Sequence, residues 1–235
     1  MTRRPWLLLS IPIALLLVSA CTTTTGTGTD TTDFRASAGT LAYETGNGLS
    51  LIYLFDLDQA PADGEIEVTI TGPDGWNADQ SLTTTSFFTT AGNKWSWRNL
   101  TADAVDGTYT LTTQFDGRNY EEVLEVASDD VLVLPDPQTV LKQHDVVAAT
   151  WPEVPSAASY YVQLYTDSNG HLPRGTLRAY TTSNSYTFSG LSLTAGTTYY
   201  LGVQTMSSDF SESNPKLPAG QFNTSFKAVS FLIDE

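Results

Sequence analysis

The sequence predicts an all-β protein in which a signal peptide and a flexible tether precede two β-sandwiches in tandem. Short segments alternate apolar and polar residues, and turn-forming residues separate them roughly every 8 to 15 residues. No window shows apolar residues sustained at the 3.6-residue period of an amphipathic helix. About 200 residues follow the N-terminal segments, enough for two domains of ordinary size.

Residues 1–20 have the pattern of a signal peptide. Arg3 and Arg4 precede an apolar segment, Trp6 to Val18, which Ser10 and Pro12 interrupt. A membrane-spanning helix needs about 20 apolar residues, so this segment is too short to span. It ends in Val-Ser-Ala-Cys at residues 18–21, and Cys21 is the only cysteine of the chain.

This ending resembles the lipobox of bacterial lipoproteins, in which an aliphatic and two small residues precede a cysteine. The resemblance implies cleavage before Cys21, a diacylglyceryl group on its thiol, and an acyl chain such as palmitate on its new amino group. Each buried methylene contributes about 0.8 kcal/mol, so two or three chains would hold the protein on the lipid bilayer. The alternative is an ordinary secretory signal with a chance free cysteine.

Residues 21–33 are expected to form a disordered tether. Thr22 to Asp33 is rich in Thr, Gly and Asp and offers no apolar side chain to a core. Fully extended, it reaches about 40 Å. In lipoproteins of bacteria with two membranes, aspartate after the cysteine favours inner-membrane retention. Because Thr22 stands there, the resemblance favours an outer-membrane anchor over one in the cell membrane, with the body facing the periplasm or exterior.

The charge narrows the choice of partner. The chain has 26 acidic and 11 basic residues, a formal net charge of −15. Such a surface repels phosphate backbones, so nucleic acid is an unexpected partner. It also repels anionic lipid headgroups, which keeps the folded body away from the bilayer that anchors it.

The first sandwich is predicted over residues 34–130. In "EIEVTI", Ile66, Val68 and Ile70 share one face of a strand, and "GLSLIYLFDL" is consistent with a buried strand. A hairpin, "DGTYTLTTQFDGRNYEEVLEV", turns at Gly117. It resembles the last hairpin of an immunoglobulin-like domain.

The boundary is predicted within residues 127–138. Two prolines flank Asp136, and proline cannot donate to a β-ladder. Asp129 and Asp130 lie at this junction, where they are solvated turn residues or, as the less favoured alternative, hold a cation between the domains.

The second sandwich, residues 131–235, contains two sequence motifs of one known family. "VVAATWPEVPSAASYYVQLY" reaches Trp151 by alternation, and "LTAGTTY" ends at Tyr199. These stretches resemble the second strand and the tyrosine corner of fibronectin type III domains, although Ala195 replaces the family's proline. The resemblance implies that Trp151 is structural and that the Tyr199 hydroxyl bonds to backbone just upstream. No Arg-Gly-Asp tripeptide occurs, so an integrin-ligand role is not implied.

The sequence offers few residues that could carry out catalysis or bind a metal ion or cofactor. His144 and His171 lie in predicted loops without a nucleophile or carboxylate at catalytic spacing, so both are interpreted as surface residues. No catalytic residue, metal site or cofactor is expected. A glycoside hydrolase would need two carboxylates in a deep cleft, which a pair of bare sandwiches seldom provides.

Trp95 and Trp97 are the remaining candidates. Two residues apart, they share one face of a strand. If solvent-facing, they would form a stacking platform for a sugar; the favoured interpretation is that they fill the core. The sequence thus predicts a lipid-anchored, non-enzymatic binding or structural module, whose partner is another envelope protein or a glycan. The alternative is a surface carbohydrate-binding module that uses Trp95 and Trp97.

Overall fold

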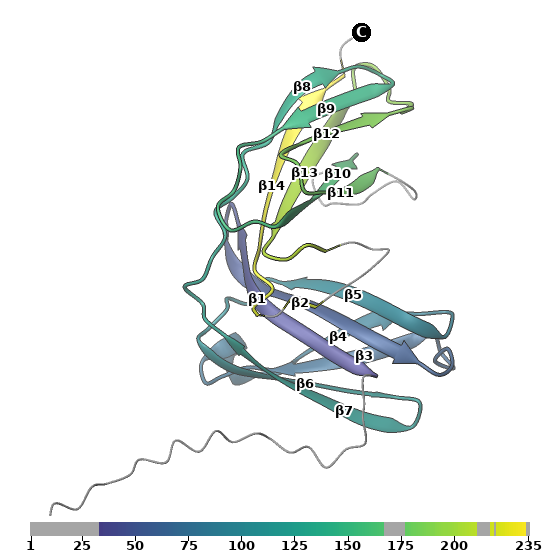
Figure 1. The fold of residues 1–235 in the computed structure, drawn as a ribbon, viewed down its shortest axis with the longest axis vertical. Coiled ribbons are helices and arrows are strands. Elements are labelled where there is room, and N and C mark those ends of the chain that lie inside the picture. The colour runs from purple at the N-terminus through teal and green to yellow at the C-terminus, as the bar shows by residue number, and fades with distance from the viewer. Residues whose placement is uncertain (1–32, 167–176, 211–216, 219, 234–235) are drawn as a thin grey trace, which may run out of the picture. The chain divides into compact units, whose positions relative to one another are not determined.

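The computed structural model describes residues 33–166, 177–210, 217–218 and 220–233, and this part of the chain is all-β (Figure 1). One 3₁₀ helix, η1 (Trp76–Asp79), interrupts the strands. Within the described residues, no helix has the length and apolar character that crossing a membrane requires. The predicted all-β fold class is therefore confirmed.

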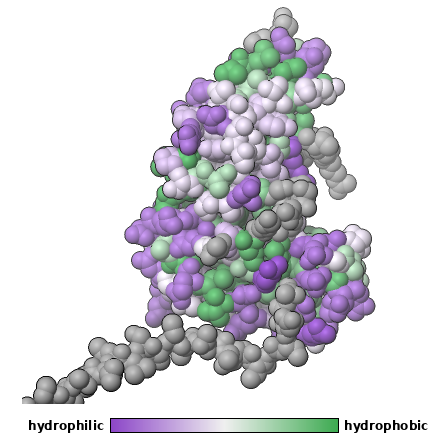
Figure 2. Space-filling view, viewed as in Figure 1, coloured by the Kyte–Doolittle hydropathy of each residue, from purple (hydrophilic) through white to green (hydrophobic). Residues whose placement is uncertain are grey.

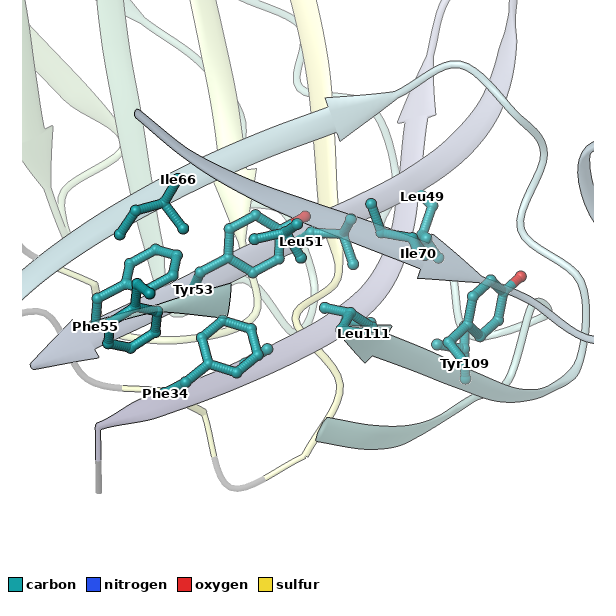
Figure 3. Packing of buried hydrophobic residues seen from close by; sticks show 14 of the residues in the cluster. Phe34, Leu49, Leu51, Tyr53, Phe55, Ile66, Ile70, Tyr109 and Leu111 are labelled. Carbon is teal, nitrogen blue, oxygen red and sulfur yellow. The ribbon is translucent and has the colours of Figure 1, made fainter. Parts of the chain in front are cut away.

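Seven strands of the N-terminal half form two packed layers. They are β1 (Phe34–Tyr43), β2 (Gly46–Leu57), β3 (Glu65–Thr71), β4 (Leu82–Phe87), β5 (Gly92–Leu100), β6 (Gly107–Phe115) and β7 (Arg118–Val126). One layer has the strand order β4-β3-β6-β7, and the other contains β1-β2-β5. Ile66, Val68 and Ile70 of β3 are buried and alternate with polar residues, as the sequence predicts. All three belong to one apolar cluster with aromatic residues of β1 and β2, and Figure 3 shows Ile66 and Ile70 in that cluster together with Phe34 and Tyr53.

The C-terminal half has the same two-layer arrangement. Its strands are β8 (Gln138–Lys142), β9 (Val146–Thr150), β10 (Ser159–Tyr165), β11 (Arg178–Thr181), β12 (Ser185–Ser189), β13 (Thr198–Met206) and β14 (Thr224–Leu232). The sheet β12-β9-β8 packs against β11-β10-β13-β14. Between them lie Val147, Val162, Leu201 and Val203, all 0% exposed.

The two halves share one sheet. Strand β14 pairs in parallel with β1, from Leu41 opposite Thr224 to Tyr43 opposite Phe226. This pairing joins the two layers into a seven-stranded sheet with the order β11-β10-β13-β14-β1-β2-β5. Thr32–Glu235 accordingly forms one compact unit. The division at residue 130 remains a prediction about independent folding, which truncation tests.

A candidate binding cleft at the junction of the two halves

Hydrogen bonds of Asn223 hold the segment before β14 against β1. Its Oδ1 accepts the Thr40 N–H at 2.9 Å and the Gln221 Nε2 at 3.0 Å. Its Nδ2 donates to Asp130 Oδ2 at 2.7 Å, and the Thr40 hydroxyl donates to the Asp130 carbonyl at 2.6 Å. Asn223 is 3% exposed, so these bonds are sheltered from competing water. Three segments distant in sequence, around Thr40, Asp130 and Asn223, are thereby fixed together.

The Asp130 carboxylate is thus engaged by an amide. Among the described residues, no group of three or more His, Cys, Asp or Glu side chains could hold a metal ion. The suggested cation at Asp129 and Asp130 has no support from this geometry.

Gly39 permits the closest backbone approach at this junction. A Cβ at this position would lie 2.5 Å from the Phe222 carbonyl carbon and 2.5 Å from Asn223 Oδ1. The Phe222 N–H donates to the Ala38 carbonyl at 2.9 Å, which sets how close the two segments come. Only a residue without a side chain fits here.

A third cluster of apolar side chains packs on the face of the shared sheet opposite the C-terminal core. Tyr161, Gln204 and Met206 share this face on β10 and β13, and Ile52, Trp95 and Trp97 share it on β2 and β5. The buried members come from both halves: Ile52, Tyr161, Met206, Phe210 and Phe222.

Trp95 and Trp97 lie half-buried against this cluster. The Trp95 ring meets Phe210 edge-on at a centroid distance of 5.0 Å, and Trp97 meets Phe222 edge-on at 5.5 Å. The Trp97 indole N–H lies 3.1 Å from both Ser50 Oγ and Asn99 Oδ1. Each tryptophan therefore contacts the C-terminal half while keeping part of its surface open.

Both tryptophans line a cleft of about 480 Å³. The lining residues come from the ends of β4 and from β5, β10, β11 and β13: Phe87, Phe88, Trp95, Ser96, Trp97, Arg98, Asn99, Tyr161, Tyr180 and Gln204. Phe87 is 69% exposed, so its ring is open to solvent at the rim of the cleft. The volume falls within the roughly 300–1,000 Å³ of small-molecule sites.

Two polar groups give the cleft its electrostatic character. Gln204 is 4% exposed, and its amide nitrogen has no hydrogen-bond partner in the part of the chain that the structure describes. Arg98 is the one charged residue of the lining. Its guanidinium donates to the Trp97 carbonyl at 2.9 Å and to the Thr85 carbonyl, so it is already occupied by the protein itself.

Two titratable groups outside the cleft illustrate how the fold shifts proton affinity. Burial raises the pKa of Tyr53 to about 12, which keeps this core hydroxyl neutral. Hydrogen bonds from the Ser128 N–H and hydroxyl lower the pKa of Asp106 below its ordinary 3.8. Neither is placed to act as an acid or base at the cleft.

The remaining predicted site residues lie away from the cleft. Trp151 is 3% exposed and packs edge-on against Tyr160 at 5.3 Å. The Tyr199 hydroxyl accepts the Thr194 N–H at 3.0 Å. His144 is exposed, with Nδ1 3.7 Å from Asp145. Cys21 and His171 fall outside the described residues.

Sequence reasoning missed a tyrosine corner in the first half. The Tyr109 hydroxyl accepts the Val105 N–H at 2.9 Å and lies 3.0 Å from the Val105 carbonyl oxygen. A Gly-Thr pair lies directly before Tyr109 at residues 107–108, and another lies at residues 196–197, one residue farther from Tyr199. That shared pair is the signal that could have identified it. The cleft residues Phe87, Tyr161, Tyr180 and Gln204 carried no such local signal.

Comparisons with known proteins give only distant structural neighbours. No protein-family model matches the sequence, and no curated protein is significantly similar to it. The fibronectin type III domain of human collagen alpha-1(XX) chain is 17% identical, covering 46% of this chain and 91% of its own, with a TM-score of 0.33. The two-domain fibronectin type III segment of chicken tenascin is 12% identical, covering 80% and 92%, with a TM-score of 0.29.

Chicken CNTN1 domains FN1–FN3 are 12% identical, cover 86% of this chain and 66% of their own, and have a TM-score of 0.31. Similarities at this level carry no functional information. The fold follows instead from the molecule's own strand order, in which each half packs a three-stranded against a four-stranded layer. The two halves are β-sandwiches of immunoglobulin-like and fibronectin type III-like architecture.

Proposed function

We propose that this chain is a membrane-anchored extracytoplasmic lipoprotein whose β-sandwiches form a non-enzymatic binding or structural module of the cell envelope. The observation that carries the proposal is the Val-Ser-Ala-Cys ending at residues 18–21, placed shortly before a folded β-sandwich body. Two or three acyl chains on Cys21 would supply an anchor that a single chain does not.

The surface of the body supports a role outside the membrane. Much of the face seen in Figure 2 is hydrophilic, with smaller hydrophobic areas between. The formal net charge of −15 opposes contact with anionic headgroups. The polar side chains in the cleft lining are amides, hydroxyls and an engaged guanidinium, which suit hydrogen bonding to a ligand better than proton transfer.

Replacing the proposed anchor tests this placement. Cys21→Ser removes the thiol that a diacylglyceryl group needs, whereas Thr22→Ser leaves it intact and serves as the matched control. Cells carrying each variant would be labelled with radioactive palmitate and separated into soluble and membrane fractions. We expect label and membrane retention in the parent and in Thr22→Ser, and neither in Cys21→Ser. Unchanged membrane retention of Cys21→Ser would contradict the proposal.

The partner is proposed to be another envelope protein or a glycan. Photo-crosslinking in cells from positions on the exposed strand faces, followed by mass spectrometry, would identify a protein partner. Separation of the membranes in a two-membraned host would test the outer-membrane placement that Thr22 favours.

One specific observation favours a second candidate function, which is carbohydrate binding by Trp95 and Trp97. Both rings line a cleft that also holds an unpartnered buried amide.

A further inference from the structure

We propose that the cleft between β5, β10 and β13 binds a short neutral carbohydrate, with Gln204 as its buried hydrogen-bond donor and Phe87 as a stacking surface at its rim. This inference rests on the proposed binding function and deepens it by naming the ligand class. It also extends the predicted tryptophan pair to residues of the C-terminal half.

Gln204 supplies the polar anchor. It is 96% buried, it lines the cleft, and its amide nitrogen lacks a partner. Most buried polar side-chain atoms in folded proteins are hydrogen-bonded, so an unpartnered donor in a residue that lines a cavity calls for an acceptor from a ligand. A sugar hydroxyl or ring oxygen accepts from an amide N–H₂ at hydrogen-bond distance.

The aromatic side chains supply the apolar contact. The exposed ring of Phe87 and the half-buried ring of Trp95 both belong to the lining, and Tyr180 stacks on Tyr161 at a centroid distance of 4.6 Å on strands β11 and β10. A pyranose has a face of C–H groups surrounded by hydroxyls. Aromatic side chains bury much apolar surface with little conformational freedom to lose, so such a face packs well against them.

Charge and size select a neutral, short ligand. No carboxylate lines the cleft, and the guanidinium of Arg98 is bound to backbone carbonyls, which leaves an anionic ligand without a free cation. About 480 Å³ accommodates a few sugar units. A neutral oligosaccharide therefore fits the cleft better than an anionic one. Because β5 and β11 are edge strands of the shared sheet, an extended peptide is the competing ligand class that the test includes.

The site requires both halves of the molecule. Phe87, Trp95 and Trp97 come from β4 and β5, while Tyr161, Tyr180 and Gln204 come from β10, β11 and β13. The β1–β14 pairing and the Asn223 hydrogen bonds hold these strands in place. Binding should therefore depend on the junction as well as on the lining residues.

The test uses the full-length protein purified in detergent. It would be applied to an array of immobilised neutral gluco-, xylo-, manno- and chito-oligosaccharides of two to six units. Polygalacturonate and a proline-rich decapeptide would be included as competing ligand classes. The strongest signal would be followed by calorimetric titration of the parent and four variants.

Gln204→Leu removes the donor, and Gln163→Leu, on the same sheet face but outside the cleft lining, is its matched control. Phe87→Ala removes the exposed ring without disturbing the core, and Val123→Ala, 55% exposed on β7, is its control. We expect both cleft variants to bind the oligosaccharide at least tenfold more weakly, and both controls to bind it as the parent does.

The inference would be overturned if the parent protein gave no stronger signal on any neutral oligosaccharide of the array than the Gln204→Leu variant gives. Binding only to polygalacturonate or to the peptide would overturn it equally, as would affinity that neither Gln204→Leu nor Phe87→Ala changes. These failures are distinct from that of the proposed function. Loss of the lipid anchor is read from palmitate labelling of Cys21, which is independent of sugar binding.

Discussion

Replacing Gly39 with alanine should destabilise the junction that joins the two halves. The new Cβ would stand 2.5 Å from the Phe222 carbonyl carbon, well inside contact distance, and both neighbouring atoms are held by backbone or buried bonds. Strand β1 and the Phe222–Asn223 segment must therefore separate. The Phe222 side chain, 0% exposed, moves with that segment.

The size of the effect follows from the contacts that are lost. Two hydrogen bonds, Phe222 N–H to Ala38 O and Thr40 N–H to Asn223 Oδ1, contribute about 1 kcal/mol each. Overpacking a tight site costs about 1–3 kcal/mol more. We therefore expect the free energy of unfolding to fall by about 3–5 kcal/mol. For a unit of this size, 1 kcal/mol corresponds to about 2–4 °C in Tm.

Urea unfolding followed by tryptophan fluorescence measures this loss, because Trp95 and Trp97 report on the junction. Gly220→Ala is the matched control: a Cβ there meets no atom within 4 Å, so its stability should stay within about 0.5 kcal/mol of the parent. A Gly39→Ala protein as stable as Gly220→Ala would refute the reasoning, since the close approach would then be unnecessary.

Two further predictions concern the first half. Tyr109→Phe removes the hydroxyl that bonds to Val105, so thermal unfolding should show a loss of about 1–2 kcal/mol, and an unchanged Tm would argue against this corner. The lowered pKa of Asp106 makes its hydrogen bonds with Ser128 stabilising above pH 3.8 and progressively lost as the pH falls below that value. Asp106→Asn should therefore flatten the acid limb of the stability profile, measured by urea unfolding between pH 2.5 and 7, and an acid limb as steep as the parent's would contradict this assignment.

The strands of each sandwich could be predicted because local patterns encode them. Ile66, Val68 and Ile70 alternate with polar neighbours since one face of β3 is buried and the other is solvated. The hairpin at Gly117 and the strand that leads to Trp151 carry equally local signals.

The junction could not be predicted in this way. Strand β1 is buried along almost its whole length, on both faces, so the alternation that marks a half-buried strand is missing. Its partner β14 lies at the other end of the chain, and no local pattern specifies a parallel pairing over that distance. The local patterns therefore predict two sandwiches in tandem and no strand pairing between them.

The cleft was hidden for a related reason. In β13, the alternation that places Leu201 and Val203 in the C-terminal core puts Gln204 on the opposite face, and no local pattern indicates what covers that face. The shared sheet sets this face against residues of β5. The sequence places Trp95 and Trp97 on one face of a strand. Neither of the two predicted environments, the core of the sandwich or a solvent-facing platform, included contact with the C-terminal half.

Differential scanning calorimetry of the intact protein tests most directly whether β1 and β14 join the halves into one unit that holds the cleft in place. We predict a single transition whose calorimetric and van't Hoff enthalpies agree. Two resolved transitions, one of them reproduced at the same temperature by a protein truncated after Asp130, would contradict this and would restore two independent sandwiches.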